Sequence, residues 1–182
     1  MEYWIVYDVA SGEELWRGSG SLGTGAFQQL PKGAALIVVP QAVIARPVLD
    51  LDALRETLAS RVDAEASAVS GRFITATPAQ IGIYVLKEVA ARTWLLDREA
   101  STLMLAPEAQ ARGMTVEALA AEVVAQADTW TAIAGMIEGV RMGAKARLAA
   151  ADTLGAIVAA AALDWSAVAA AEQALAANAP SN

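Results

Sequence analysis

The sequence predicts an α+β fold: a small N-terminal antiparallel β-sheet followed by an alanine-rich helical body, whose long helices pack antiparallel or as an oligomer. Aromatic and β-branched runs are concentrated before residue 49. After it, apolar residues recur at helical spacing, and turn or capping residues separate the periodic segments. We therefore expect a β-rich head over 1–48, which could act as a docking module, and a helical domain over 49–182.

The head contains the strand signals. Residues 3–7 are aromatic and β-branched, and a turn sequence at 9–12 leads to a second extended segment at 14–17, which predicts a hairpin. Two further β-branched runs, 35–39 and 43–46, are each followed by proline. We expect three or four short strands in one antiparallel sheet.

Helix start signals predict two helices in the next part of the chain. Asp50 or Asp52 can cap a helix that runs to about residue 68, and an extended linker is expected at 72–75. The sequence 77–80 (TPAQ) combines a hydroxyl N-cap, proline at the first helical position and a glutamine that can reach back to the cap. It predicts a helix from residue 78 to about 97.

The longest predicted helix runs from 116 to about 149. Within it, Gly135, Gly139 and Gly143 recur every four residues, although each glycine costs a helix roughly 1 kcal/mol relative to alanine. Such a row lets another backbone approach closely, either from the same chain or from another subunit. The residues leave both alternatives open, and we favour packing within the chain.

Two shorter helices are expected at 153–162 and 165–177, with a tail that frays from residue 178. Alanine-rich helices bury little area per residue, so larger side chains must fill the space between them. We expect Trp94, Trp130 and Trp165 to anchor this core.

Composition excludes much of the chemistry of enzymes. The chain has no histidine and no cysteine, so it lacks a serine–histidine triad, a thiolate nucleophile and the usual zinc ligands. The segment 18–23 has the glycine spacing of a dinucleotide-binding loop, but no βαβ unit can follow it, and a turn is favoured. We expect no enzymatic activity, no cofactor and no metal. A hydrolase using the acids Glu65, Glu88 and Glu122 is the remaining enzymatic alternative.

Net charge and hydropathy argue against nucleic acid as a partner and against membrane insertion. A net charge of -7 repels phosphate backbones, so nucleic acid is not expected as a partner. The longest uncharged apolar run, 154–163, is about half of the roughly 20 residues that a spanning helix needs, so membrane insertion is not expected. The first residues show no secretory leader, which predicts synthesis in the cytoplasm.

Two segments carry a family resemblance. Residues 3–8 (YWIVYD) with 11–13 (SGE) and 16–19 (WRGS) resemble the hairpin that opens small tail-region proteins of bacteriophages and prophages. Residues 74–80 (ITATPAQ), followed by Tyr84, Lys87 and 88–90 (EVA), are similar to a helix of phage tail-fibre-type proteins. The resemblance implies a virion protein of the tail, fibre or baseplate region, made in the bacterial host cytoplasm and located in the virion.

The resemblance also implies partners. Proteins of this kind form homo-oligomers, commonly trimers, so we expect contacts with other copies and with other virion tail proteins. The alternative is a tail-fibre assembly chaperone that acts in the infected host cytoplasm. The candidate interface residues come from the glycine row and the first strand: Gly135, Gly139, Gly143, Tyr3, Trp4 and Tyr7.

Overall fold

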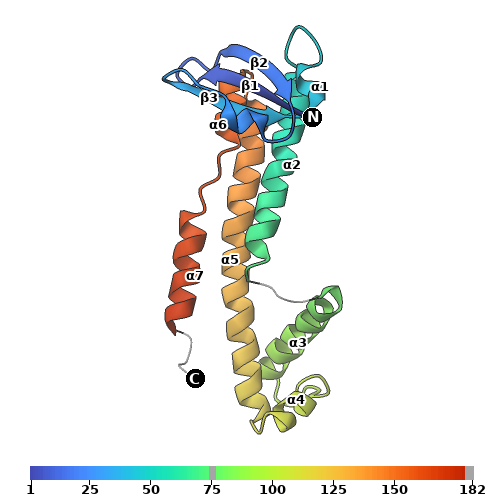
Figure 1. The fold of residues 1–182 in the computed structure, drawn as a ribbon. Coiled ribbons are helices and arrows are strands. Elements are labelled where there is room, and N and C mark those ends of the chain that lie inside the picture. Colours follow the sequence, from blue (N-terminus) through green and yellow to red (C-terminus); the bar gives the residue numbers. More distant parts are fainter. Residues whose placement is uncertain (74–76, 179–182) are drawn as a thin grey trace. The chain divides into compact units, whose positions relative to one another are not determined.

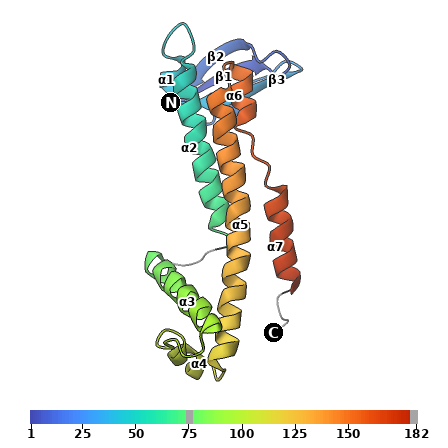
Figure 2. The same ribbon diagram turned by 180° about the vertical axis from the view of Figure 1, so that it is seen from behind.

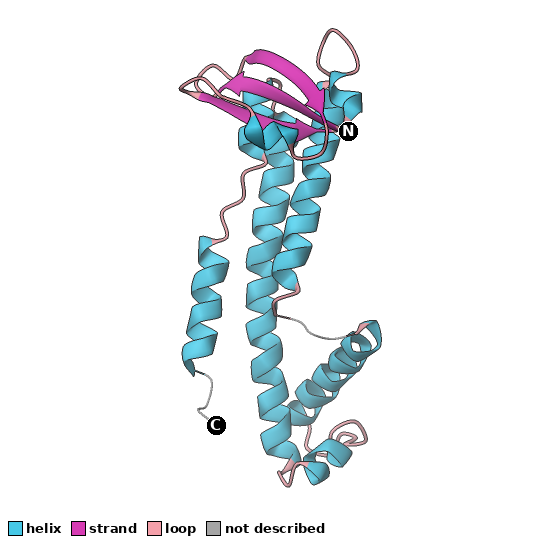
Figure 3. Cartoon of the chain, viewed as in Figure 1, coloured by secondary structure: helices cyan, strands magenta, loops and turns pink. Residues whose placement is uncertain are grey.

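The computed structural model describes residues 1–73 and 77–178, and it confirms the predicted α+β class (Figures 1 and 3). The predicted linker 72–75 lies partly outside these residues, and the tail beyond 178 lies outside them. The elements, in chain order, are β1 (Glu2–Asp8), β2 (Glu14–Gly20), the 3-10 helix η1 (Thr24–Phe27), β3 (Ala34–Val39), α1 (Gln41–Ile44), α2 (Leu51–Ser70), α3 (Pro78–Leu96), α4 (Ala106–Ala111), α5 (Val116–Ala150), α6 (Leu154–Ala160) and α7 (Ser166–Asn178).

The three strands form one antiparallel sheet with the order β2-β1-β3. The predicted hairpin joins β1 to β2. Its turn is held by Asp8, whose carboxylate accepts hydrogen bonds from the backbone N–H groups of Ala10 and Ser11 at 3.0 and 2.8 Å. Gly12 then takes a positive φ of 72°, a conformation that glycine adopts without steric cost.

The strand predicted at 43–46 is wrong, because residues Gln41–Ile44 form the one-turn helix α1 instead. Pro40 lies at its N-cap with extended dihedrals, and the Val43 N–H donates to the Pro40 carbonyl, so the chain turns as soon as β3 ends. Val43 is thereby buried in the core. Burial in a short turn therefore outweighs the β-preference of two β-branched residues.

The chain forms two compact units, and each is described by itself. The first comprises residues 1–68 and 138–169, and the second comprises residues 69–137 and 170–182. The division expected at residue 48 differs from this grouping, because the sheet shares one hydrophobic core with the helices of the first unit. Helix α5 contributes its last turns to the first unit and its first turns to the second.

The core of the first unit lies beneath one face of the sheet. Ile5, Ile37 and Val39 point from β1 and β3 into the same cluster as Leu54 and Leu58 of α2. Helix α6 and the last turns of α5 close this cluster, and both views show α2 running beside this part of α5 (Figures 1 and 2). The inward residues of β1 alternate, as the two-residue period of a strand requires.

The opposite face of β1 carries Trp4, which is only 4% exposed. It is paired with Gly18 of β2, and a Cβ on Gly18 would lie 2.8 Å from the indole atoms Cε2 and Cζ2. The glycine-rich segment expected to be a turn is therefore a strand end followed by a turn. Its first glycine accommodates a tryptophan ring.

The second unit has its own small core. Ala91 of α3, Leu105 and Ala109 around α4, and Leu119 and Ala120 of α5 are all buried in it. Helix α4 has no counterpart among the sequence predictions, although Pro107 and Glu108 in its first turn are typical of a helix start.

The three tryptophans predicted as core anchors are half-buried. Trp94 packs against the core of the second unit, and the Trp130 ring lies 6.4 Å from that of Phe73. In the first unit, Trp165 Nε1 donates to Glu65 Oε1 at 2.7 Å. Of the three, Trp94 therefore lies at the edge of a core, and Trp4 is more deeply buried than any of them.

Candidate interaction surface

Helix α3 begins at the capping box that the sequence predicts. Thr77 Oγ1 accepts from the Gln80 N–H at 3.4 Å, and Gln80 Oε1 accepts from the Thr77 N–H at 2.8 Å. Together with Pro78 at the first helical position, these bonds satisfy N–H groups that would otherwise lack a partner. The start of the helix is therefore determined locally, without packing.

The C-terminal half of α3 is fixed to the rest of the second unit. Ala91 is fully buried, and two ion pairs flank it: Lys87 Nζ lies 2.6 Å from Glu108 Oε2, and Arg92 Nη2 lies 2.5 Å from Asp128 Oδ1. The hydrogen bond from Lys87 holds the pKa of Glu108 below its usual value. These contacts join α3 to α4 and to the first part of α5.

The N-terminal half of α3 is apolar and exposed. We call the exposed apolar residues of this half, together with Val89 one turn further along the helix, the α3 surface; its six side chains are each 45–62% exposed: Ile81, Ile83, Tyr84, Val85, Leu86 and Val89. Between Arg72 and Lys87 the sequence has no charged residue. Figure 1 shows this half of the helix extending away from α4 and from the first turns of α5.

A helix with this exposed apolar surface is expected to pack against a partner. A helix that is apolar on every side is normally buried, and the exposed faces of ordinary surface helices are polar. A contiguous exposed apolar patch on a water-facing protein commonly marks an interaction site. The α3 surface is therefore the candidate functional site. Sequence reasoning identified the helix and missed the surface, although the uninterrupted run of apolar residues at 81–86 was a visible signal.

The predicted interface residues of β1 lie elsewhere, in the first unit. Trp4 is buried, and Tyr3 and Tyr7 pack against the hydrophobic core from its edge. Burial raises the pKa of the Tyr7 hydroxyl. The structure thus gives all three residues a packing role within the chain, and their role in an interface stays a prediction.

The glycine row lies along α5. A Cβ on Gly135 or Gly139 would meet no atom of the described residues within 4 Å, and one on Gly143 would meet only the Arg147 guanidinium, at 3.6 Å. The favoured alternative, helix packing within the chain, therefore finds no support at these positions. A contact with another subunit stays a prediction for them.

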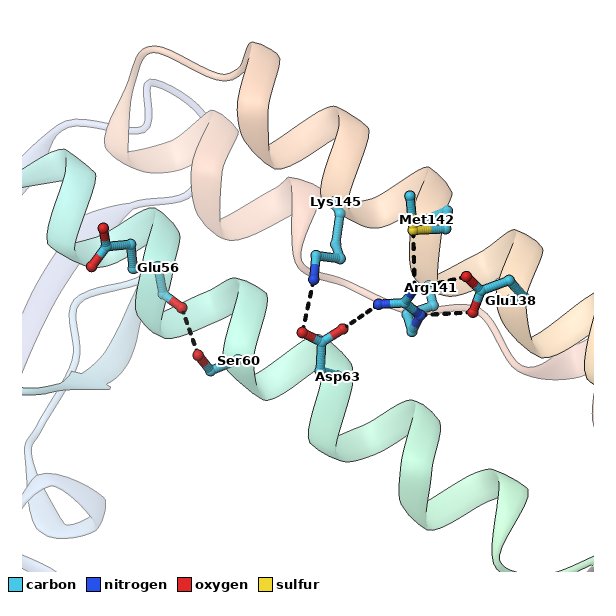
Figure 4. Close-up of polar contacts among 7 residues, drawn as sticks. All are labelled: Glu56, Ser60, Asp63, Glu138, Arg141, Met142 and Lys145. Atoms are coloured by element: carbon cyan, nitrogen blue, oxygen red, sulfur yellow. Dashed lines mark hydrogen bonds and ion pairs between the residues drawn. The ribbon is translucent and has the colours of Figure 1, made fainter. Parts of the chain in front are cut away.

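A charged cluster connects α2 to α5 within the first unit (Figure 4). Asp63 accepts from Arg141 Nη1 at 2.6 Å and from Lys145 Nζ at 2.8 Å, and Arg141 also bonds to Glu138 at 2.7 Å. Hydrogen bonds from Lys145 and Arg141 hold the pKa of Asp63 below its usual value. Because each charge has an opposite partner, the cluster functions as a connection between helices.

The acids of the hydrolase alternative are engaged in separate contacts. Glu65 accepts from Trp165, Glu88 pairs with Arg92, and Glu122 pairs with Arg112. Among the described residues, no group of three acidic side chains is placed to hold a metal ion. None of the helices described has the length and apolar character needed to cross a bilayer.

An apolar hollow of about 310 Å³ lies in the second unit, lined mainly by Phe73, Trp130, Ile133 and Leu175. Its polar groups are few, and the Thr129 hydroxyl already donates to the Ala125 carbonyl at 2.8 Å. Specific ligand sites combine apolar walls with convergent polar groups, and this hollow lacks such a set.

Comparison with known proteins gives no relative: no protein-family model matches the chain, and neither a curated protein nor a solved structure is similar to it.

Proposed function

We propose that this protein is a structural component of a bacteriophage virion, in the tail, fibre or baseplate region, and that it assembles as a homo-oligomer. The resemblance of the first hairpin and of the segment 74–90 to phage tail proteins suggests the setting. The observation that carries the proposal is the α3 surface, because six exposed apolar side chains on one helix favour a protein that works through contacts with other subunits.

Such a protein acts through the shape and position of its surfaces. The sheet and its helices form a packed body, and α3 presents an apolar surface from an anchored base. Burying this surface in an assembly would supply the driving force, at roughly 25 cal/mol for each Å² of apolar area removed from water. The surface could then join subunits without chemical turnover.

Mass spectrometry of purified virions tests this function. We expect the chain at a fixed ratio to the other tail proteins, after gradient purification that removes host proteins. An abundant phage protein known to be absent from particles serves as the control for contamination. Detection in the infected cell together with absence from virions would overturn the proposal and favour an assembly chaperone.

A further inference from the structure

We propose that α3 has a second, closed position, in which its first turns lie along α5 of the same chain and cover the side of the α3 surface that carries Ile81 and Tyr84. The inference is carried by the existing contact between α3 and α5, by the spacing of residues on the two helices and by their charge. It does not depend on a virion setting, and only its consequence for assembly rests on the proposed function.

The two helices are already in contact near the end of α3. Ala91 is fully buried in the same core as the first turns of α5. Arg98 Nη2 lies 2.9 Å from Glu117 Oε1. Arg92, which is nearer to the start of α3, bonds to Asp128, which is further along α5. The helices are therefore antiparallel, and the contact ends where the first turns of α3 diverge from α5 (Figures 1 and 2).

The side of α3 that faces α5 continues beyond this contact as exposed apolar side chains. The Arg92 guanidinium bonds to Glu88 of its own helix as well as to Asp128, so Glu88 lies on the side of α3 that faces α5. Ile81, Tyr84 and Glu88 follow at i, i+3 and i+7, which places them on one face. Ile81 is 45% exposed and Tyr84 is 51% exposed.

The matching face of α5 is open at the same level. Asp128, Thr131 and Gly135 also follow at i, i+3 and i+7. An equal number of residues along each helix from the ion pair at the end of α3 reaches Tyr84 and Thr131, and about one further turn reaches Ile81 and Gly135. Thr131 and Gly135 are exposed, and a Cβ on Gly135 would meet no atom of the described residues within 4 Å. The backbone at Gly135 therefore permits close approach of α3.

The charges on both helices are compatible with closing. Helix α5 has no charged residue between Asp128 and Glu138, and α3 has none before Lys87. Lys87 lies 5.7 Å from the centre of the Tyr84 ring, and its charge is already paired with Glu108 at 2.6 Å. Closing therefore brings two uncharged faces together and buries no unpaired charge, which would be costly.

A pivot at Ala91 allows this movement. Lys87 and Arg92 lie within about one turn of Ala91, so the ion pairs made by their long side chains can follow a change in the angle of α3. Removing apolar area from water favours the closed position. Leu86, on the opposite side of α3, stays exposed. Under the proposed function, closing withholds part of the α3 surface from other subunits until one of them competes with α5 for it.

Disulfide formation within one chain tests the closed position, and the absence of natural cysteines makes each introduced pair unambiguous. In I81C/G135C the two thiols should meet when α3 closes. The matched control is I83C/G135C, because Ile81 and Ile83 are 45% and 47% exposed but lie on opposite sides of the helix. We expect the disulfide to form about tenfold faster in I81C/G135C, because closing raises the effective concentration of the two thiols. Equal rates, or disulfides that join only separate chains, would overturn the proposal.

Modification of single thiols by a maleimide gives a second measure that needs no disulfide. I81C should react about threefold more slowly than I83C, because the closed fraction of the chain hides position 81 alone. Gly135→Trp should abolish this difference, since the indole occupies the face of α5 on which α3 closes. Circular dichroism checks that each variant is folded. If I81C and I83C react equally fast while Gly135 is present, α3 does not close.

These measurements use the purified full chain, so they separate the two proposals. If the chain is absent from virions but I81C/G135C forms its disulfide faster than the control, the virion function fails and this inference stands. If virions contain the chain and the two cysteine pairs react equally, the virion function stands and the closed position is rejected.

Discussion

Gly155 in the first turn of α6 donates its backbone N–H to the carbonyl oxygen of Gly12 in the β1–β2 turn, at 3.2 Å. The two backbones meet without an intervening side chain. A Cβ on Gly155 would overlap the Gly12 Cα, and a Cβ on Gly12 would lie 2.9 Å from the Gly155 Cα. The hairpin and α6 are therefore positioned by a contact that only glycine permits.

Replacing Gly155 by alanine should destabilise the first unit. The added methyl group collides with backbone, which cannot rotate away as a side chain can, so the hairpin and α6 must separate. Overpacking of this kind typically costs about 1–3 kcal/mol. Urea unfolding followed by circular dichroism should show this loss in the free energy of unfolding.

The matched control is Gly139→Ala, also in the first unit. Gly139 lies inside α5, and its Cβ would meet no atom of the described residues within 4 Å. Alanine is favoured over glycine in a helix interior by roughly 1 kcal/mol, so this variant should be more stable than the natural chain. Equal effects of the two substitutions would contradict the Gly12–Gly155 contact.

Gly18→Ala should destabilise the sheet through Trp4. The new Cβ would lie 2.8 Å from the buried indole, which has little freedom to move because Trp4 is 4% exposed. In a Trp4→Phe background the smaller ring leaves room, so the same substitution should cost less. A double-mutant cycle measures the coupling, which we expect to be roughly 1 kcal/mol for residues in direct contact. Additive effects would show that Gly18 is needed for another reason.

The sequence predicted most elements whose signals are local. The hairpin, β3 and the long helices have their own periodicity, and the TPAQ start of α3 has its own cap, so each could be inferred without knowing what it packs against. The error at residues 43–46 has a tertiary cause, because burial of Val43 decides the conformation of a segment too short to show periodicity.

The candidate site was harder to predict from the sequence than the fold was. A helix with apolar residues on every side predicts burial, and the pattern does not say which neighbour supplies it. The exposure of Leu86 and Val89 became visible only when the fold showed which part of α3 the second unit covers. The Gly12–Gly155 contact joins residues far apart in the chain, and no local signal predicts it.

Asp63→Asn should change how stability depends on pH. In the folded state, hydrogen bonds from Lys145 and Arg141 depress the pKa of Asp63, so its contribution is present above the unfolded pKa of about 3.9 and is lost as pH falls through the folded pKa. The natural chain should therefore be more stable than the variant near pH 7, and the difference should shrink below about pH 4. Urea unfolding at a series of pH values measures this.

Lys145→Met provides the control for this cluster. Removing one of the two donors to Asp63 raises its folded-state pKa toward the unfolded value, so the acid-dependent part of the stability should become smaller. High salt should also reduce the acid-dependent part of the stability, because it screens these partly exposed charges. If the natural chain and Asp63→Asn lost the same free energy of unfolding on acidification, the cluster would contribute nothing to folding.

Thr77→Ala should loosen the first turns of α3 without unfolding the second unit. The N-terminal half of the helix is exposed, so it depends on its cap more than on packing, and short unpacked helical segments are marginal in water. Losing an N-cap costs about 1 kcal/mol, which corresponds to roughly fivefold faster hydrogen exchange of the amides it protects. Exchange measured by mass spectrometry, at a concentration where the chain is a single copy, should show this acceleration at 80–83.

By contrast, Thr153→Ala removes the cap of α6, whose Leu154 and Ile157 are buried, and its cost should appear in the unfolding of the first unit. Unchanged exchange in Thr77→Ala would mean that another contact already holds the start of α3.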